Sequence, residues 1–227
     1  MSTLTPSRTL LIAHGVPDDV FHDRAFSALS KPVKVAYIGV ANGDQPNWFR
    51  RVQNTLEKRH GAQVELVNSD SVTDSEAQIA QADVVYLAGG DVGLLANWYT
   101  RGHVREAILA RQRAGATLIG VSAGAIGLAP YWILFAGDSP DGKDHRIACA
   151  GAIPFAIDCH DEDSDWEELR ALLSVWSRDE PDAVVDAYGI PSDGALEVLG
   201  DSVQVLGGVP KIFRLDKGRI VTIGVDR

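Results

Sequence analysis

The sequence predicts an α/β protein with a mainly parallel sheet, helices on both faces of the sheet and an antiparallel C-terminal meander at one edge. Two features of the 227-residue chain indicate this class. In the first 135 residues, short apolar runs rich in β-branched residues alternate with longer amphipathic stretches. In the last third, short runs follow one another with only brief glycine-containing turns between them. Apolar strands separated by helices are typical of parallel βαβ units, whereas such brief turns permit only hairpins.

The strands expected in the parallel sheet are bounded by turn residues and are, in chain order, Thr9–Ala13, Val33–Val40, Gln63–Val67, Asp83–Leu87 and Thr117–Val121. Amphipathic stretches that predict helices lie between them, such as Trp48–His60 and Thr100–Ala114. We expect right-handed crossovers between the parallel strands. The carboxyl ends of the strands then meet at one edge, where ligands bind in open α/β sheets.

The expected meander follows Gly194, and its strands are Ala195–Leu199, Ser202–Leu206, Lys211–Leu215 and Arg219–Ile223. We expect these strands to extend one edge of the parallel sheet, because mixed sheets of this kind are common in doubly wound proteins. No internal repeat, low-complexity tract or long linker divides the chain. We therefore expect one domain over residues 1–227.

Composition limits the classes of partner. The net charge of −10 and the pI near 5.0 argue against a nucleic-acid partner, which would require a basic surface. No apolar run approaches the roughly 18 residues of a membrane span, and the segment Met1–Arg8 lacks the pattern of a signal peptide. Cys149 and Cys159 are too few for a disulfide framework and are expected to be buried thiols. We expect a cytoplasmic protein with no membrane contact.

The segment Gly120-Val121-Ser122-Ala123-Gly124 predicts a nucleophilic serine. It follows a buried-strand pattern, and small residues on both sides of Ser122 allow a sharp turn from strand into helix. Such a turn exposes the hydroxyl near a helix N-terminus, which is the geometry of a nucleophile elbow. The structural alternative is that Ser122 caps a helix and that the glycines serve close packing.

A second turn, Ala88-Gly89-Gly90-Asp91, follows the preceding strand and can lie beside the serine elbow in a parallel sheet. Glycines let backbone amides approach a reacting carbonyl without a Cβ in the way. We therefore predict that the amide of Gly89 or Gly90, together with that of Ala123, forms an oxyanion hole. An ordinary strand-to-helix turn is the alternative.

A serine hydroxyl needs a general base and a group that orients this base. We favour His160 among the six histidines, because it follows the apolar run Ile153–Cys159 and so lies at a strand end. His14, which follows the first strand, and His145 are alternatives. The remaining histidines are expected to be solvated or to begin a helix: His22, His60 and His103. Position alone allows the acid to lie before His160, at Asp138, Asp141 or Asp144, or after it, at Asp193.

Four segments occur in the order and spacing that resemble the peptidase E and cyanophycinase family of serine peptidases: Tyr86–Asp91, Gly120–Ala125, Asp158–His160 and Gly189–Gly194. The resemblance extends from about Asp83 to the C-terminal meander. It implies a class I glutamine-amidotransferase-like, flavodoxin-like fold. It also implies the order nucleophile, histidine, acid, which carries these roles onto Ser122, His160 and Asp193.

The chain departs from peptidase E in two places. Peptidase E has glutamate where this chain has Asp193. Peptidase E also uses an arginine shortly after the histidine to pair with a substrate aspartate, whereas six of the eight residues Asp161–Glu168 are acidic here. An acidic rim favours a cation or a free N-terminal ammonium, so aspartyl specificity does not follow from the resemblance.

The sequence thus predicts a serine exopeptidase or dipeptidase that hydrolyses short peptides at the N-terminal residue through Ser122, His160 and Asp193. The alternatives are an esterase or acyl hydrolase that uses Asp138 and a non-catalytic binding domain on the same fold. No metal or organic cofactor is expected, since neither a His-Glu-x-x-His helix nor a phosphate loop is present. The expected partner is a short peptide substrate, and the protein is expected to be a monomer or a homodimer. The residues expected to line the substrate pocket are His14, Asp91, Trp98, Asp161, Glu162 and Trp166.

Overall fold

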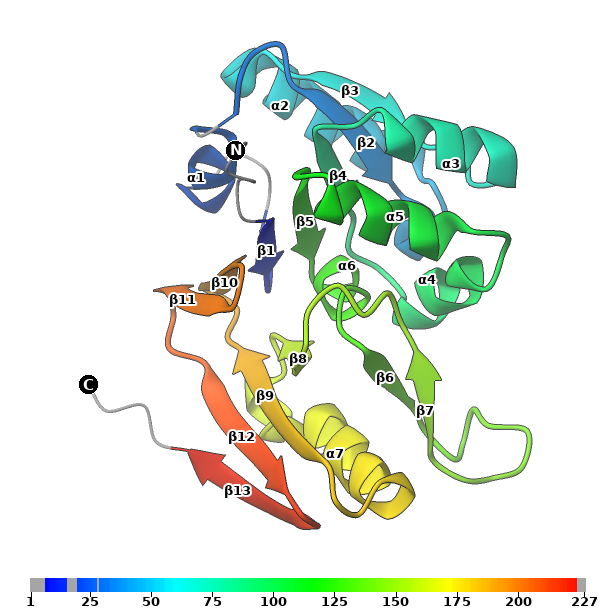
Figure 1. The fold of residues 1–227 in the computed structure, drawn as a ribbon, viewed down its shortest axis with the longest axis vertical. Coiled ribbons are helices and arrows are strands. Elements are labelled where there is room, and N and C mark those ends of the chain that lie inside the picture. The colour runs from blue at the N-terminus through cyan, green and yellow to red at the C-terminus, as the bar shows by residue number, and fades with distance from the viewer. Residues whose placement is uncertain (1–6, 16–19, 28, 224–227) are drawn as a thin grey trace, which may run out of the picture.

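A seven-stranded sheet forms the centre of the structure, a computed structural model that describes residues 7–15, 20–27 and 29–223 (Figure 1). The sheet has the order β11-β10-β1-β5-β4-β2-β3. Its parallel strands are β1 (Arg8–Ile12), β2 (Lys34–Ile38), β3 (Gln63–Leu66), β4 (Val84–Leu87) and β5 (Thr117–Val121). Strands β10 (Gly194–Leu199) and β11 (Ser202–Gly207) add an antiparallel edge beside β1. Residues 1–6, where no signal peptide was expected, lie outside the described residues.

Helices cover both faces of this sheet. One face packs against α1 (Val20–Ser27) and α2 (Pro46–His60). The other packs against α3 (Val72–Ala80), α4 (Val92–Tyr99), α5 (Val104–Arg113) and α6 (Ala123–Ile126). Alternate strand residues belong to the two cores: Leu10 and Ile12 face α1 and α2, while Leu11 faces the other layer. Because both faces are buried, the strands carry continuous apolar runs, and the predicted fold class is confirmed.

A second sheet lies below the central one in the view of Figure 1 and has the order β13-β12-β9-β8. Its strands are β8 (Ala156–Cys159), β9 (Val184–Ile190), β12 (Lys211–Asp216) and β13 (Arg219–Ile223). Helix α7 (Glu167–Asp179) shares a core with this sheet and with the hairpin of β6 (Tyr131–Leu134) and β7 (His145–Ala148). Short 3-10 turns η1 (Val40–Asn42) and η2 (Glu162–Ser164) follow β2 and β8.

The C-terminal meander is divided between the two sheets instead of lying wholly at one edge. Strands β10 and β11 extend the central sheet, but β12 and β13 pair with β9. The division occurs after β11, where Gly207 has a φ of 74° and the amide of Gly208 donates to the carbonyl of Asp193. Pro210, which has no amide to donate, stands just before β12. This turn redirects the chain, so the prediction of a single extended edge is wrong for β12 and β13.

The two cysteines are buried and are not joined to one another, as expected. Burial raises the pKa of the Cys149 thiol to about 12 and raises that of Cys159 as well, so both thiols are protonated at neutral pH. In the part of the chain that the structure describes, no helix combines the length and the apolarity that crossing a bilayer requires.

Candidate active site

Ser122 occupies a sharp turn between β5 and α6. Its φ of 51° and ψ of −119° are unusual for a residue with a side chain. The turn is held on both sides, because the amide of Ser122 donates to the carbonyl of Ile12 at 2.8 Å and its carbonyl accepts from the amide of Ala125 at 2.8 Å. Backbone strain of this kind is found where a side chain must be presented to a ligand. The helix starts at Ala123, and the Ser122 hydroxyl makes no capping hydrogen bond to it.

The small residues around Ser122 allow this turn to pack tightly. A Cβ on Gly124 would come within 2.1 Å of the carbonyl oxygen of Leu87, and one on Gly120 within 2.6 Å of the Cα of Ala125. Both glycines are therefore required by packing. The structure thus shows the close packing that was the alternative reading of these glycines, and this packing is compatible with a nucleophilic role for the partly exposed Ser122.

His160 contacts Ser122 directly. The Oγ atom of Ser122 and the Nε2 atom of His160 are 2.8 Å apart, within hydrogen-bond distance. His160 follows β8, has a φ of 49°, and donates its amide to the carbonyl of Ile190 at 2.9 Å. A strand of the second sheet thus delivers the histidine to the carboxyl end of the central sheet. The structure brings the predicted nucleophile and the predicted base together.

The other histidines are not hydrogen-bonded to Ser122 in the part of the chain that the structure describes. His14 is close, with its ring edge-on to that of His160 at 6.3 Å. His145, the first residue of β7, is hydrogen-bonded to Asp141. Asp141 belongs to the loop between β6 and β7, and this loop projects from the body of the molecule in Figure 1. His22 on α1 and His60 at the end of α2 are buried, although both were expected to be solvated. His22 stacks on Tyr86, and His60 stacks on Phe26.

The two predicted oxyanion turns lie side by side, because β4 and β5 are neighbouring parallel strands. A Cβ on Gly89 would be 3.3 Å from the Cβ of Ser122. Gly90 has a φ of 145°, and a Cβ there would come within 2.1 Å of the carbonyl oxygen of Ala41, so this position requires glycine. Among the hydrogen bonds between described residues, none is donated by the amide of Gly89, Gly90 or Ala123.

The carboxylates that could orient His160 do not touch it in this structure. Asp193 is exposed, and its side chain lies beside Gly208, where a Cβ would come within 2.0 Å of Asp193 Oδ1. Glu162 accepts from the amide of Ser192 at 2.5 Å. Asp138 is exposed in the projecting loop between β6 and β7. Within the described residues, no hydrogen bond joins His160 to a carboxylate.

Acidic groups near His160 have shifted pKa values. Burial raises the pKa of Asp158 to about 7, and repulsion from Glu168 and Asp161 adds to this rise. Burial also raises the pKa of Glu168, against a hydrogen bond from Trp132. For Glu162 burial acts upward, but the hydrogen bonds from Ser192 outweigh it and lower the pKa.

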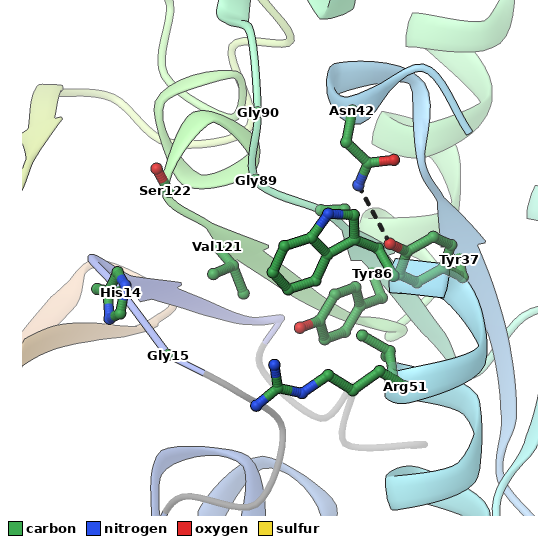
Figure 2. Close-up of a pocket in the computed structure, with 13 residues that line it drawn as sticks. His14, Gly15, Tyr37, Asn42, Arg51, Tyr86, Gly89, Gly90, Val121 and Ser122 are labelled. Carbon is green, nitrogen blue, oxygen red and sulfur yellow. Dashed lines mark hydrogen bonds between the residues drawn. The ribbon is translucent and has the colours of Figure 1, made fainter. Parts of the chain in front are cut away.

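A cavity of about 250 Å³ opens beside Ser122 (Figure 2). Its floor is formed by the ends of the central strands, including Gly89, Gly90, Val121 and Ser122. Its walls come from η1, α2 and the strands beneath them. The lining residues that the sequence did not predict are Gly15, Tyr37, Asn42, Trp48, Arg51, Val52, Tyr86, Ala88 and Val121. The sequence carried local signals for several of them, in the amphipathic helix at Trp48–His60 and the segment Tyr86–Asp91, but neither signal showed that these side chains would line a cavity.

Only some of the residues that were predicted to line the substrate pocket lie at the cavity. His14 lines the cavity. Asp91 caps α4, accepting from the amide of Leu94 at 3.0 Å. Trp98 and Trp166 are 2 % and 4 % exposed and belong to the two apolar cores, so the expectation that they line the pocket is wrong.

Asp161 and Glu162 lie immediately after His160 and are not among the residues that line this cavity. The other acidic residues of this stretch partly serve the fold: Asp165 pairs with Arg170 at 3.4 Å and with Lys211 at 3.7 Å. A search of the described residues finds no group of three or more histidine, cysteine, aspartate or glutamate side chains placed to hold a metal ion.

Comparison with known proteins identifies relatives of this chain and of its fold. The model of Peptidase family S51 matches residues 18–206. Peptidase E of Streptomyces coelicolor is 29 % identical over 196 residues, which cover 82 % of this chain and 76 % of that protein. The fold is shared with the crystal structure of a peptidase from an acI-B1 actinobacterium, with a TM-score of 0.70, 17 % identity, and coverage of 97 % of this chain and 98 % of that one. A candidate peptidase E from Listeria monocytogenes EGD-e has a TM-score of 0.67 and 18 % identity, covering 90 % of this chain and 100 % of its own.

Proposed function

The chain belongs to peptidase family S51 and is a serine peptidase, and from this premise we propose that it is an exopeptidase that releases the N-terminal residue of short peptides. The observation that carries the proposal is the 2.8 Å contact between Ser122 Oγ and His160 Nε2 beside a cavity. A cavity of about 250 Å³ has room for one or two residues of a peptide, which favours a short substrate. The relative from Streptomyces coelicolor carries the name peptidase E, in line with this activity.

The proposed mechanism begins with attack by Ser122 Oγ on the peptide carbonyl carbon while His160 Nε2 takes the hydroxyl proton. The carbonyl oxygen becomes an oxyanion, which accepts hydrogen bonds from the amide of Ala123 and from Gly89 or Gly90. One such donor contributes about 3–4 kcal/mol to the transition state. His160 then protonates the leaving amine, the C–N bond breaks, and an acyl-enzyme remains on Ser122. Water attacks this ester with His160 again as the base, which releases the N-terminal residue.

Asp193 is the acid that we propose to orient His160. Its turn directly follows β9, and the carbonyl of Ile190 at the end of β9 accepts the His160 amide. Since its carboxylate lies beside Gly208, the role requires a rotation of the side chain toward the imidazole when substrate binds. Catalytic hydrogen bonds are often incomplete before the substrate is present. Asp138, the alternative, would have to reach the site from the projecting β6–β7 loop.

The test is a panel of free and N-acetylated dipeptides, with a fluorophosphonate probe for the nucleophile. Ser122→Ala should lose labelling and at least about 10³-fold in kcat/KM, because the covalent route disappears. Ser202→Ala, at an exposed position on β11, is the matched control and should retain both. N-acetylation should abolish turnover if the enzyme acts at a free N-terminus.

The same assay separates the acids. Asp193→Asn should lower kcat/KM by at least about 10²-fold and Asp138→Asn should not, since an unoriented imidazole adopts the wrong tautomer. Equal labelling of wild type and Ser122→Ala would refute the nucleophile, and loss of activity only in Asp138→Asn would refute Asp193. Preference for p-nitrophenyl esters with no peptide turnover would instead favour the acyl hydrolase.

A further inference from the structure

Arg51 introduces a positive charge into the cavity beside the nucleophile. It lies on α2, three residues after Trp48 and so next to it on the helix surface, and both residues line the cavity. In Figure 2 Arg51 and Ser122 stand at opposite ends of the cavity. The guanidinium reaches away from α2 toward the part of the chain that carries Gly15.

No carboxylate of the described residues forms an ion pair with Arg51. Its guanidinium lies over the ring of Trp48, whose centroid is 5.9 Å from Arg51 Cζ. Two other arginines show the contrast: Arg214 pairs with Asp186, and Arg146 with Asp179 and Glu180. Arg51 therefore retains donors that can bind a ligand.

The rest of the cavity is suited to the body of a peptide. Tyr37 and Tyr86 stack at 5.5 Å between ring centroids and are almost fully buried, so they present fixed aromatic surface. Asn42 adds an amide, held by its contact with the Tyr37 hydroxyl at 3.4 Å. Apolar and aromatic walls with a small number of polar or charged groups are typical of ligand sites, where the polar groups orient the ligand. Of the common anions, a carboxylate matches the planar fork of a guanidinium.

We infer that Arg51 is a specificity-determining residue that binds a carboxylate of the substrate. The inference rests on the proposed function, because it places the carboxylate at the end of the cavity opposite the carbonyl that Ser122 attacks. Two sources share this chemistry: the C-terminal carboxylate of a dipeptide and an acidic side chain of the peptide. The acidic stretch after His160 cannot serve this purpose, since it repels a carboxylate.

The test compares peptide binding in two forms of the inactive protein, Ser122→Ala alone and Ser122→Ala with Arg51→Gln. The probes are Ala-Phe, which has only a C-terminal carboxylate, Ala-Phe amide, which has none, and Asp-Phe amide, which has only a side-chain carboxylate. Calorimetry should show that Ala-Phe or Asp-Phe amide binds at least about ten-fold more tightly than Ala-Phe amide. Arg51→Gln should remove this difference, and Arg51→Lys should retain part of it, because lysine keeps the charge but not the fork.

Arg50→Gln is the matched control. Arg50 is the exposed neighbour of Arg51 and does not line the cavity, so this variant makes the same change of charge and should keep the preference. The tighter of the two carboxylate peptides identifies the source. The inference is overturned if the three peptides bind equally, if none binds at millimolar concentration, if the preference survives Arg51→Gln, or if Arg50→Gln removes it.

Turnover by the enzyme with Ser122 intact separates this inference from the proposed function. A protein that binds peptides with the Arg51-dependent preference but hydrolyses none of them refutes the exopeptidase and leaves the inference standing. A protein that hydrolyses all of them with equal kcat/KM refutes the role of Arg51 and leaves the exopeptidase standing.

Discussion

Asp158 lies two residues before His160 and is only 5 % exposed. Its Oδ1 atom accepts from the amide of Cys159 at 2.8 Å, but this bond does not offset the loss of water around the carboxylate. Burial therefore raises its pKa to about 7, whereas an aspartate in an unfolded chain has a pKa of about 3.9. Between these values the folded protein binds a proton that the unfolded chain has lost. Stability must fall as the pH rises through this window.

We expect Asp158→Asn to remove this pH-dependent loss. The asparagine side chain can still accept from the Cys159 amide and carries no charge to bury. Near pH 4 the variant and the wild type should have similar free energies of unfolding, while at pH 8 the variant should be more stable by about 1–4 kcal/mol. Urea denaturation at both pH values measures this. Asp163→Asn, at an exposed position on η2, should show no such change, and a variant less stable than wild type at pH 8 would contradict the account.

At the scale of elements, one buried carboxylate joins α1 to the antiparallel edge of the central sheet. Glu197 on β10 is fully buried and lies 2.7 Å from Nε of Arg24 on α1 and 3.4 Å from Nε of Arg8 on β1. Arg24 also donates to Gln204 on β11 at 2.6 Å. A buried charge with one partner removed costs more than the pair contributes when intact, because the remaining charge is left out of water. This cluster therefore controls how firmly β10 and β11 are attached beside β1.

Arg24→Ala should lower the free energy of unfolding by about 2–3 kcal/mol, since Glu197 then keeps only Arg8. The loss should be smaller when Glu197→Gln is present, because a neutral amide tolerates burial better than a carboxylate. A double-mutant cycle by thermal or urea denaturation gives the coupling. Arg113→Ala, on the exposed end of α5, should change stability by less than about 0.5 kcal/mol. Additive effects of the two substitutions would show that the charges do not depend on each other.

At the scale of the whole molecule, the site spans two sheets: Ser122 follows a strand of the central sheet, and His160 follows a strand of the second. In the proposed mechanism the position of the second sheet therefore affects catalysis. Its strand β9 carries Gly189, which faces the indole of Trp166, and a Cβ there would come within 2.3 Å of Trp166 Cδ2. Strand β9 pairs directly with β8, the strand that ends at His160.

Gly189→Ala should therefore displace the indole or the strand. Overpacking of this kind lowers the free energy of unfolding by about 1–3 kcal/mol, and a displaced β8 should lower kcat more than it changes KM. Trp166→Phe in the same chain should restore part of both, because the smaller ring leaves room for the methyl group. Gly137→Ala, where no atom lies within 4 Å of the added Cβ, is the control and should be neutral. Wild-type stability and kcat in Gly189→Ala would show that the packing around Trp166 does not position His160.

Much of the fold could be predicted because its signals are local. The five parallel strands were expected within two residues of their observed ends, since each is a continuous apolar run between turn residues. Ser122 was recognisable for the same reason: a buried strand, a serine and small residues define an elbow in five consecutive positions. His160 could be favoured because a strand pattern precedes it.

What only the tertiary structure decided depends on contacts between distant segments. The division of the meander follows from the turn at Gly207 and Gly208, and brief turns alone do not say which sheet each hairpin joins. Part of the cavity wall is made by η1 and α2. In the sequence Arg51 is one of several arginines on an amphipathic helix, and only the folded structure shows that it lies across the cavity from Ser122. The sequence by itself determined the strands, the class of fold and the sharp turn at Ser122, because local sterics and hydrophobic periodicity specify them. The tertiary structure decided what surrounds that nucleophile, because a cavity exists only where several elements meet.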